Sequence, residues 1–191
     1  MGDVLRTFFA LEIGDAARRV AGAVAERLAA EPGGDAVRWT RAEAYHVTLR
    51  FLGPTRREQV AGLAGAVREA AAAVAPFALR LGALNGFPEP RRARIVVVDL
   101  EPAGPITALA AAVERAVVAE GFAPEERAFH PHLTLGRVRE RRRRGPLLDA
   151  SLGPAEPAPF DVASLVFFQS TLGPGGSQYT PLERIPLGGD S

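Results

Sequence analysis

Two short phrases of the sequence share one form and constrain the fold most strongly. His46-Val47-Thr48-Leu49 and His132-Leu133-Thr134-Leu135 both read His-x-Thr-Leu in apolar surroundings, and they contain two of the three histidines. In a β-strand, residues i and i+2 point to the same face, so each phrase predicts an imidazole beside a hydroxyl, opposite an apolar face. Two such pairs facing one substrate would supply two groups with pKa values near neutrality. That arrangement suits general acid–base catalysis.

The hydrophobic pattern around these phrases predicts an α+β fold. We expect strands over 6–13, 37–40, 44–52, 77–84, 94–100, 129–138, 159–170 and 178–185, and helices over 16–30, 55–74 and 105–120. Asp15 and the pair Thr55 and Glu58 are expected to cap the first two helices. The order of elements suggests an architectural duplication. We therefore predict one domain over 1–191, with antiparallel sheets and outer helices in two pseudo-symmetric lobes around a central cleft.

Composition excludes several classes of function. The net charge is +1, so strong global attraction to nucleic acid is not expected. The sequence has no cysteine, which excludes disulfides, thiolate chemistry and a cysteine-based zinc site. No apolar run approaches the roughly 20 residues that span a bilayer, and the N-terminus lacks the pattern of a signal peptide. We expect a cytoplasmic monomer with no membrane association and no evident protein partner.

Arginines near the two phrases favour a substrate that contains phosphate. Strand alternation places Arg50 on the same face as His46. It places Arg137 on the face away from His132 unless the strand bends after Gly136. Hydroxyl, imidazolium and guanidinium groups together suit a phosphate bound without a metal. The sequence has neither a carboxylate cluster for magnesium nor a Gly-rich nucleotide loop. No metal or cofactor is therefore expected.

Two aromatic residues and one charged segment are further candidates for substrate contacts. Phe8 lies on the mixed face of the first strand, where it would either stack on a base or pack in the core. Tyr179 would either close the pocket or be an ordinary strand tyrosine. The segment Arg139–Arg144 would be a solvated loop or a clamp on the RNA backbone, and in the second case affinity would fall with salt.

These motifs resemble the two-histidine (2H) phosphoesterase superfamily, and more closely its RNA 2′,3′-cyclic phosphodiesterases, also known as 2′-5′ RNA ligases. The resemblance covers nearly the whole chain. The matching segments are 6–11, 38–39, 46–53, 86–95, 129–137, 170–172 and 176–179. One departure is His130, where the family usually has a basic residue, and it adds a third imidazole near the site.

The resemblance implies hydrolysis of RNA 2′,3′-cyclic phosphate ends, including those of tRNA fragments, to 2′-phosphates. It implies that His132 accepts a proton from water and that His46 donates a proton to the leaving 3′ oxygen. Thr48 and Thr134 would hydrogen-bond the non-bridging oxygens, and Arg137 would bind the phosphate. The reverse reaction would join a 5′-hydroxyl in a 2′-5′ linkage without ATP.

Three alternatives stay open at this point. A non-catalytic RNA-binding module would explain the arginines but not the duplicated His-Thr pairs. A metal site could use His130, His132 and His46. A cyclic phosphodiesterase acting on small nucleotides or 2′-5′ oligoadenylate would carry the same motifs. Because the two motifs are pseudo-symmetric, the assignment of acid and base comes from the resemblance alone.

Overall fold

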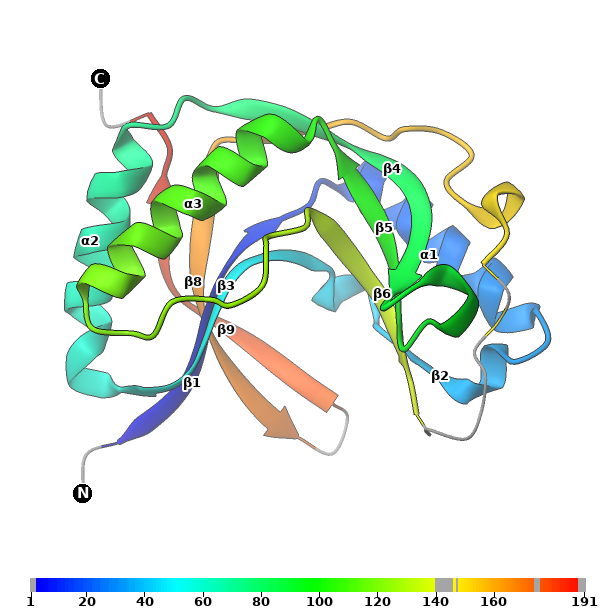
Figure 1. Ribbon diagram of the computed structural model, residues 1–191, viewed down its shortest axis with the longest axis horizontal. Helices are drawn as coiled ribbons and strands as arrows, with labels where there is room; N and C mark the ends of the chain where they lie inside the picture. The colour runs from blue at the N-terminus through cyan, green and yellow to red at the C-terminus, as the bar shows by residue number, and fades with distance from the viewer. Residues whose placement is uncertain (1–2, 140–145, 147, 174–175, 189–191) are drawn as a thin grey trace.

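The computed structural model describes residues 3–139, 146, 148–173 and 176–188, and it consists of two antiparallel sheets with helices outside them (Figure 1). The first sheet has the strand order β3-β1-β8-β9 and the second the order β2-β6-β5-β4-β7. The predicted α+β class is therefore confirmed. The strands are β1 (Val4–Glu12), β2 (Val37–Trp39), β3 (His46–Arg56), β4 (Phe77–Phe87), β5 (Ile95–Glu101), β6 (His132–Val138), β7 (Phe160–Val162), β8 (Ser164–Gly173) and β9 (Gly176–Pro186). The α-helices are α1 (Asp15–Ala30), α2 (Val60–Ala72) and α3 (Ala103–Ala119).

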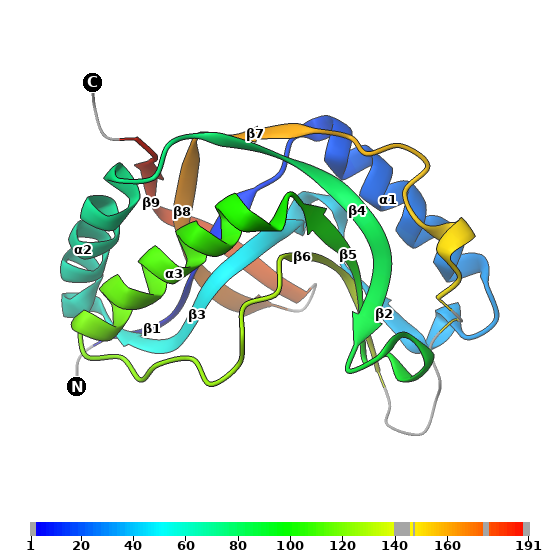
Figure 2. The same cartoon turned by 45° about the horizontal axis from the view of Figure 1, so that its top comes forward.

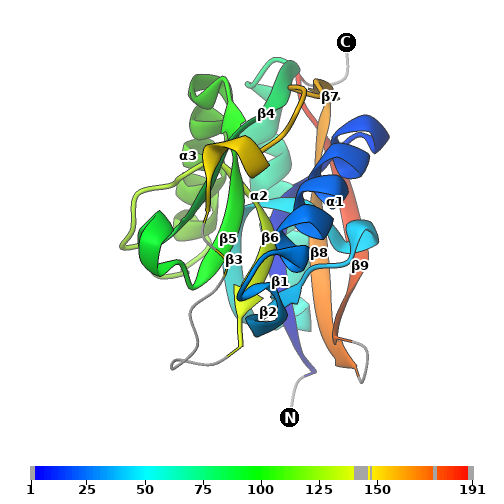
Figure 3. The same ribbon diagram turned by 90° about the vertical axis from the view of Figure 1, so that its right-hand side faces the viewer.

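The two sheets are not built from successive halves of the chain. The first sheet combines β1 and β3 with β8 and β9, so it joins both ends of the sequence. Helix α1 packs against β2, β4 and β6 of the second sheet, whereas α2 contacts β9 and α3 contacts β3 of the first. Figure 3 shows α1 and α3 on opposite sides of the strands. None of the helices among the described residues is long and apolar enough to cross a membrane.

The predicted strand over 159–170 is in fact two strands. Its first part, β7, pairs with β4 of the second sheet, and its second part, β8, pairs with β1 of the first sheet. Figure 2 shows β7 lying along the start of the long, curved β4. The chain therefore passes from one sheet to the other between β7 and β8.

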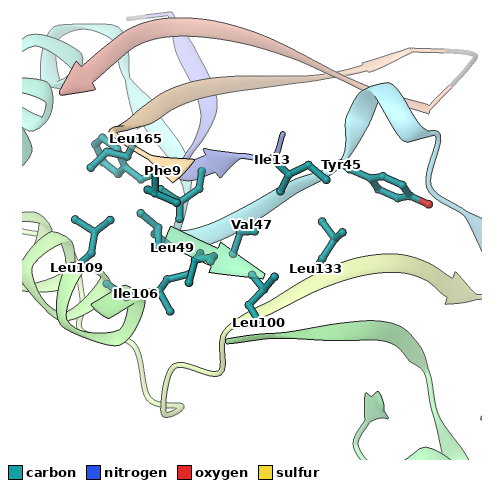
Figure 4. Close-up of a cluster of buried hydrophobic side chains, with 14 of the residues drawn as sticks. Phe9, Ile13, Tyr45, Val47, Leu49, Leu100, Ile106, Leu109, Leu133 and Leu165 are labelled. Atoms are coloured by element: carbon teal, nitrogen blue, oxygen red, sulfur yellow. The ribbon is translucent and has the colours of Figure 1, made fainter. Parts of the chain in front are cut away.

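One hydrophobic core joins the two sheets and the three α-helices, and it includes both motif strands. Val47 and Leu49 of β3 belong to the same buried cluster as Leu133 and Leu135 of β6. Figure 4 shows Val47 and Leu133 in the space between the two strands. Because alternate residues of a strand point to opposite faces, the histidine and threonine of each motif lie on the face away from this core. We call this the catalytic face of each sheet.

Strand β3 carries one extra residue at the leucine that ends its motif. In the pairing of β1 with β3, Ala10 is opposite Thr48 and Phe9 is opposite Arg50, which leaves Leu49 without a residue opposite it. This is a β-bulge, and an insertion of one residue reverses the alternation of the side chains that follow, here as far as a second extra residue at Leu52.

Strand β6 has the same irregularity at the equivalent leucine. Val97 of β5 is opposite Thr134 and Val96 is opposite Gly136, so Leu135 is the extra residue. A Cβ atom on Gly136 would lie 2.6 Å from Cγ1 of Val37, so this close approach of β2 requires glycine. Both motifs therefore end in a bulge, and both bulges reverse the alternation that follows.

Two predicted helix caps are wrong. Strand β3 continues through Arg56, so Thr55 is buried inside the strand and does not begin a helix. Gly53 has a positive φ of 73°, as in a turn, but the strand passes through it. At the start of α1, Gly14 is the N-cap and Asp15 lies in the first turn.

The buried pair of hydroxyls on β1 and β3 gives a test of this register. Thr7 Oγ1 and Thr55 Oγ1 are 2.7 Å apart, and Thr55 also donates to the carbonyl oxygen of Gly53 at 3.3 Å. Thr55→Val leaves the Thr7 hydroxyl buried without this partner, so we expect the free energy of unfolding to fall by about 1–3 kcal/mol. Thr7→Val should cost less, because Thr55 keeps its bond to Gly53. Urea denaturation measures both, and equal losses would contradict this account.

Candidate active site

The two motif histidines begin their strands and are held in the same way. Nδ1 of His46 lies 2.8 Å from the carbonyl oxygen of Ala44, and Nδ1 of His132 lies 2.7 Å from that of His130. A carbonyl oxygen only accepts hydrogen bonds, so each Nδ1 carries the hydrogen and donates it. Nε2 is therefore the nitrogen of each ring that is left to take up or release a proton.

Aromatic rings fix the orientation of both imidazoles. His46 packs against Tyr179, with ring centroids 4.8 Å apart, and against Phe8 at 5.0 Å. His132 packs edge-on against Phe87 at 5.1 Å. The two histidines thus have matching backbone bonds but different aromatic neighbours, which come from different sheets.

The pKa values of both imidazoles lie below the ordinary value of 6.5. Burial is the main cause of the lowered pKa of His46, and the positive charges of Arg137 and His132 lower it further, against the bond to Ala44. Burial also lowers the pKa of His132, and so do the charges of His130 and Arg137. Arg137 therefore acts on both imidazoles, and the two motifs lie close enough to interact electrostatically. At neutral pH, both rings are mainly uncharged.

The bulge in β6 places Arg137 on the catalytic face, beside the histidine and threonine of its motif. Arg137 is opposite Ile95 of β5, which alternates with Val97 and Asp99, the residues opposite Thr134 and His132. Strand alternation alone had predicted the other face unless the strand bent after Gly136. The extra residue at the bulge is the physical reason for the difference.

The bulge in β3 moves Arg50 off the catalytic face. The prediction that Arg50 shares a face with His46 is therefore wrong. Arg50 lies opposite Phe9, a core residue, so it leaves the face of His46. Its guanidinium instead pairs with Glu114 of α3 and with Glu125, 3.3 Å from Nη1. With both carboxylates in place, Arg50 does not lie where a substrate phosphate would meet the motif.

Phe51 takes the place that the prediction had given to Arg50. It is opposite Phe8 and is 41% exposed, so it stands on the catalytic face as the counterpart of Arg137 in the second motif. The guanidinium carbon of Arg6 lies 4.7 Å from the centre of the Phe51 ring. The sequence carries a signal for this match, because Phe51 and Arg137 are each the third residue after the threonine of their motif.

The two aromatic candidates lie beside His46. Phe8 is only 3% exposed and packs against Phe168 and Tyr179, so it has no open face for a base and belongs to the support of His46. Of the two alternatives for Phe8, the structure agrees with packing in the interior and not with stacking on a base. Tyr179 is partly buried with its ring edge-on to His46.

Beside His132 lies a polar network that sequence reasoning missed. Nε2 of His130 donates to Asp99 Oδ1 at 2.8 Å, and Asn85 Nδ2 donates to Asp99 Oδ2 at 3.1 Å. The Asp99 charge raises the pKa of His132, against the larger effect of burial. No carboxylate is among the groups that shift the pKa of His46. Glu12 lies opposite His46 as Asp99 lies opposite His132, but Glu12 forms an ion pair with Arg184, and only His132 has its pKa raised by a carboxylate.

Two further expectations from the sequence concern a metal site and the arginine-rich segment 139–144. Within the described residues, no three His, Asp or Glu side chains form a group that could hold a metal ion. In the predicted clamp segment, Arg139 is exposed, and the remaining positions 140–144 lie outside the described residues.

Replacing Arg137 tests the electrostatic arrangement of the site. In Arg137→Gln, we expect the pKa values of His46 and His132 both to rise, because the positive charge that disfavours imidazolium is removed. NMR titration of the imidazole resonances measures this, with Arg19→Gln on the exposed side of α1 as a control of equal charge change. Unchanged pKa values in Arg137→Gln would show that the guanidinium does not face the two rings.

Known proteins are similar to this chain in sequence. A family model described as the 2′-5′ RNA ligase superfamily matches residues 15–174. An RNA 2′,3′-cyclic phosphodiesterase of Aeropyrum pernix is 35% identical over 146 residues, which are 75% of this chain and 82% of the relative. Another, of Methanothermobacter thermautotrophicus, is 30% identical over 153 residues, 79% of this chain and 83% of the relative.

Solved structures show the same fold. A crystal structure of a Thermus thermophilus protein has a TM-score of 0.77 and 25% identity, and the match covers 98% of this chain and 100% of that one. Escherichia coli LigT complexed with 3′-AMP also has a TM-score of 0.77, with 24% identity and coverage of 97% and 99%. Because the family model spans most of the sequence, including both His-x-Thr motifs, the chain belongs to the 2′-5′ RNA ligase superfamily.

Proposed function

We propose that this protein hydrolyses the 2′,3′-cyclic phosphate at the end of an RNA to a 2′-phosphate by acid–base catalysis between His46 and His132, without a metal. The observation that carries the proposal is the matched pair of imidazoles, each with Nδ1 bound to a carbonyl oxygen and Nε2 left for proton exchange. The relatives named as RNA 2′,3′-cyclic phosphodiesterases support the same substrate.

The proposed reaction uses both motifs at one phosphorus atom. His132 takes a proton from water, whose oxygen forms a bond to phosphorus as the bond to the 3′ oxygen breaks. His46 gives its proton to that leaving oxygen. Thr48, Thr134 and Arg137 donate to the non-bridging oxygens, where negative charge develops in the transition state. A positive charge on His132 lowers the pKa of His46, so protonation of both rings at once is disfavoured, and the reaction uses the state in which His46 is protonated and His132 is neutral.

The position of Asp99 supports the assignment of His132 as the base. A general base must become positively charged during the reaction, and a neighbouring carboxylate stabilises that charge. Asp99 lies opposite His132 in the sheet, and His130 and Asn85 hold its two oxygens. Glu12 has the equivalent position opposite His46, but the guanidinium of Arg184 pairs with it and offsets its charge. The pKa of His46 is lowered mainly by burial, which favours release of its proton to the leaving oxygen.

Phe51 is the proposed contact for the terminal base. It is an exposed aromatic ring on the catalytic face, and nucleobases of unpaired RNA commonly stack on such rings. Ends of tRNA fragments fall within this substrate class. The reverse reaction, with a 5′-hydroxyl in place of water, would give a 2′-5′ linkage at the same site. A cyclic mononucleotide is the second candidate substrate, because all the catalytic groups act at the terminal nucleotide.

The direct test is a product assay in EDTA on a short RNA with a 2′,3′-cyclic phosphate end. We expect the wild-type protein to give a 2′-phosphate, and His46→Ala and His132→Ala to lose about 10²–10⁴-fold in rate, because each removes a positioned acid or base. His130→Ala removes the third imidazole and should lose far less. A 3′-phosphate product, or activity that requires added metal, would contradict the mechanism.

A second test concerns the asymmetry between the histidines. In Asp99→Asn, we expect the pKa of His132 to fall and that of His46 to stay unchanged, with kcat reduced about 3- to 10-fold as the base weakens. Glu101→Gln is the matched control, since Glu101 lies further along β5 and pairs with Arg80. NMR titration and steady-state kinetics give the two readouts. An unchanged pKa of His132 would remove Asp99 from the mechanism.

A further inference from the structure

A second arginine stands beside Arg137 on the catalytic face. Arg38 of β2 is directly opposite Arg137 in the antiparallel pairing with β6, and paired residues share one face of the sheet. Its neighbours Val37 and Trp39 pack in or against the hydrophobic core, so Arg38 points to the other side. The side chain of Arg38 is exposed.

Two guanidinium groups directly opposite each other repel, which is unfavourable in a sheet without a compensating anion. Within the described part of the chain, none of the ion pairs includes Arg38 or Arg137. The planar guanidinium presents paired donors that match two phosphate oxygens. The pair therefore suits an extended anion with more than one phosphate.

The two arginines differ in their distance from the reacting atoms. Arg137 lowers the pKa of both His46 and His132, whereas Arg38 is not among the groups that shift either one. Strand β2 is the edge strand of its sheet, about 4.8 Å further out than β6. Arg38 thus lies one step beyond the phosphate that Arg137 meets.

We propose that Arg38 binds the phosphodiester that precedes the cyclic phosphate end, an inference that rests on the proposed function. The site would then prefer an RNA chain to a cyclic mononucleotide. The contact is to the backbone and carries no sequence preference. It also gives the RNA chain a direction, because the body of the substrate leaves the site across β2. The chemical class of the ligand is a single-stranded ribonucleotide chain with at least one internal phosphodiester.

The experiment compares 2′,3′-cyclic AMP with a trinucleotide that ends in a 2′,3′-cyclic phosphate, for wild type, Arg38→Gln and Arg19→Gln. The two variants lose the same charge, but Arg19 lies exposed on α1, which packs on the core side of the second sheet. For Arg38→Gln, we expect kcat/KM to fall about tenfold on the trinucleotide and far less on the mononucleotide. The slope of log kcat/KM against log salt should weaken by about 0.7, the value for one phosphate of a single strand.

Each other outcome has one meaning. An equal loss on both substrates, or no loss on either, overturns the proposal for Arg38 while leaving the proposed function intact. An effect of Arg19→Gln as large as that of Arg38→Gln would assign the loss to net charge and also overturn it. If wild type cleaves neither substrate, the proposed function fails, and the proposal fails with it. Arg38→Lys should recover part of the loss, because the charge is kept and the paired donors are not.

Discussion

The site depends on an extra residue directly after the threonine of each motif. Side chains of a strand alternate with a period of two, so a single insertion moves every later side chain to the other face. The insertions fall at Leu49 and Leu135, after the threonine of each motif. The positions that return to the catalytic face are therefore Phe51 and Arg137. One motif supplies an exposed ring and the other a cation, which together suit a nucleotide with its base and its phosphate.

The symmetry of the backbone contrasts with an asymmetry of charge. Both imidazoles donate from Nδ1 to the carbonyl oxygen two residues earlier, so their geometry gives no reason for one to be the acid and the other the base. The difference comes from the residues around them. Asp99 raises the pKa of His132, whereas Glu12, opposite His46, is paired with Arg184, and the rings of Phe8 and Tyr179 pack against His46. A duplicated structural element can thus acquire two chemical roles through its neighbours alone.

The local pattern predicted the motif strands and the class of fold, because alternation and turn residues act over a few neighbouring positions. It did not predict the bulges, since a bulge is defined by the number of residues on the partner strand. The error for Arg50 has this cause. Thr and Glu three residues apart fit a capping box, which predicts a helix cap at Thr55, but the hydroxyl of Thr55 contacts that of Thr7, 48 residues away. The network at Asp99 was missed for the same reason, as its members lie on β4, β5 and the segment before β6.

Arg50, which the bulge moves off the catalytic face, links the first motif strand to the segment before the second. Arg50 is displaced to the core side by the bulge, where its side chain is only 10% exposed and pairs with Glu114 and Glu125. It also donates to the carbonyl oxygen of Ala123, in the segment that leads from α3 to His130 and the second motif. Removing one charge from such a largely buried group leaves the others without compensation, which lowers the stability of the fold. The insertion in β3 therefore both brings Phe51 to the catalytic face and ties the first motif strand to the chain that positions the second.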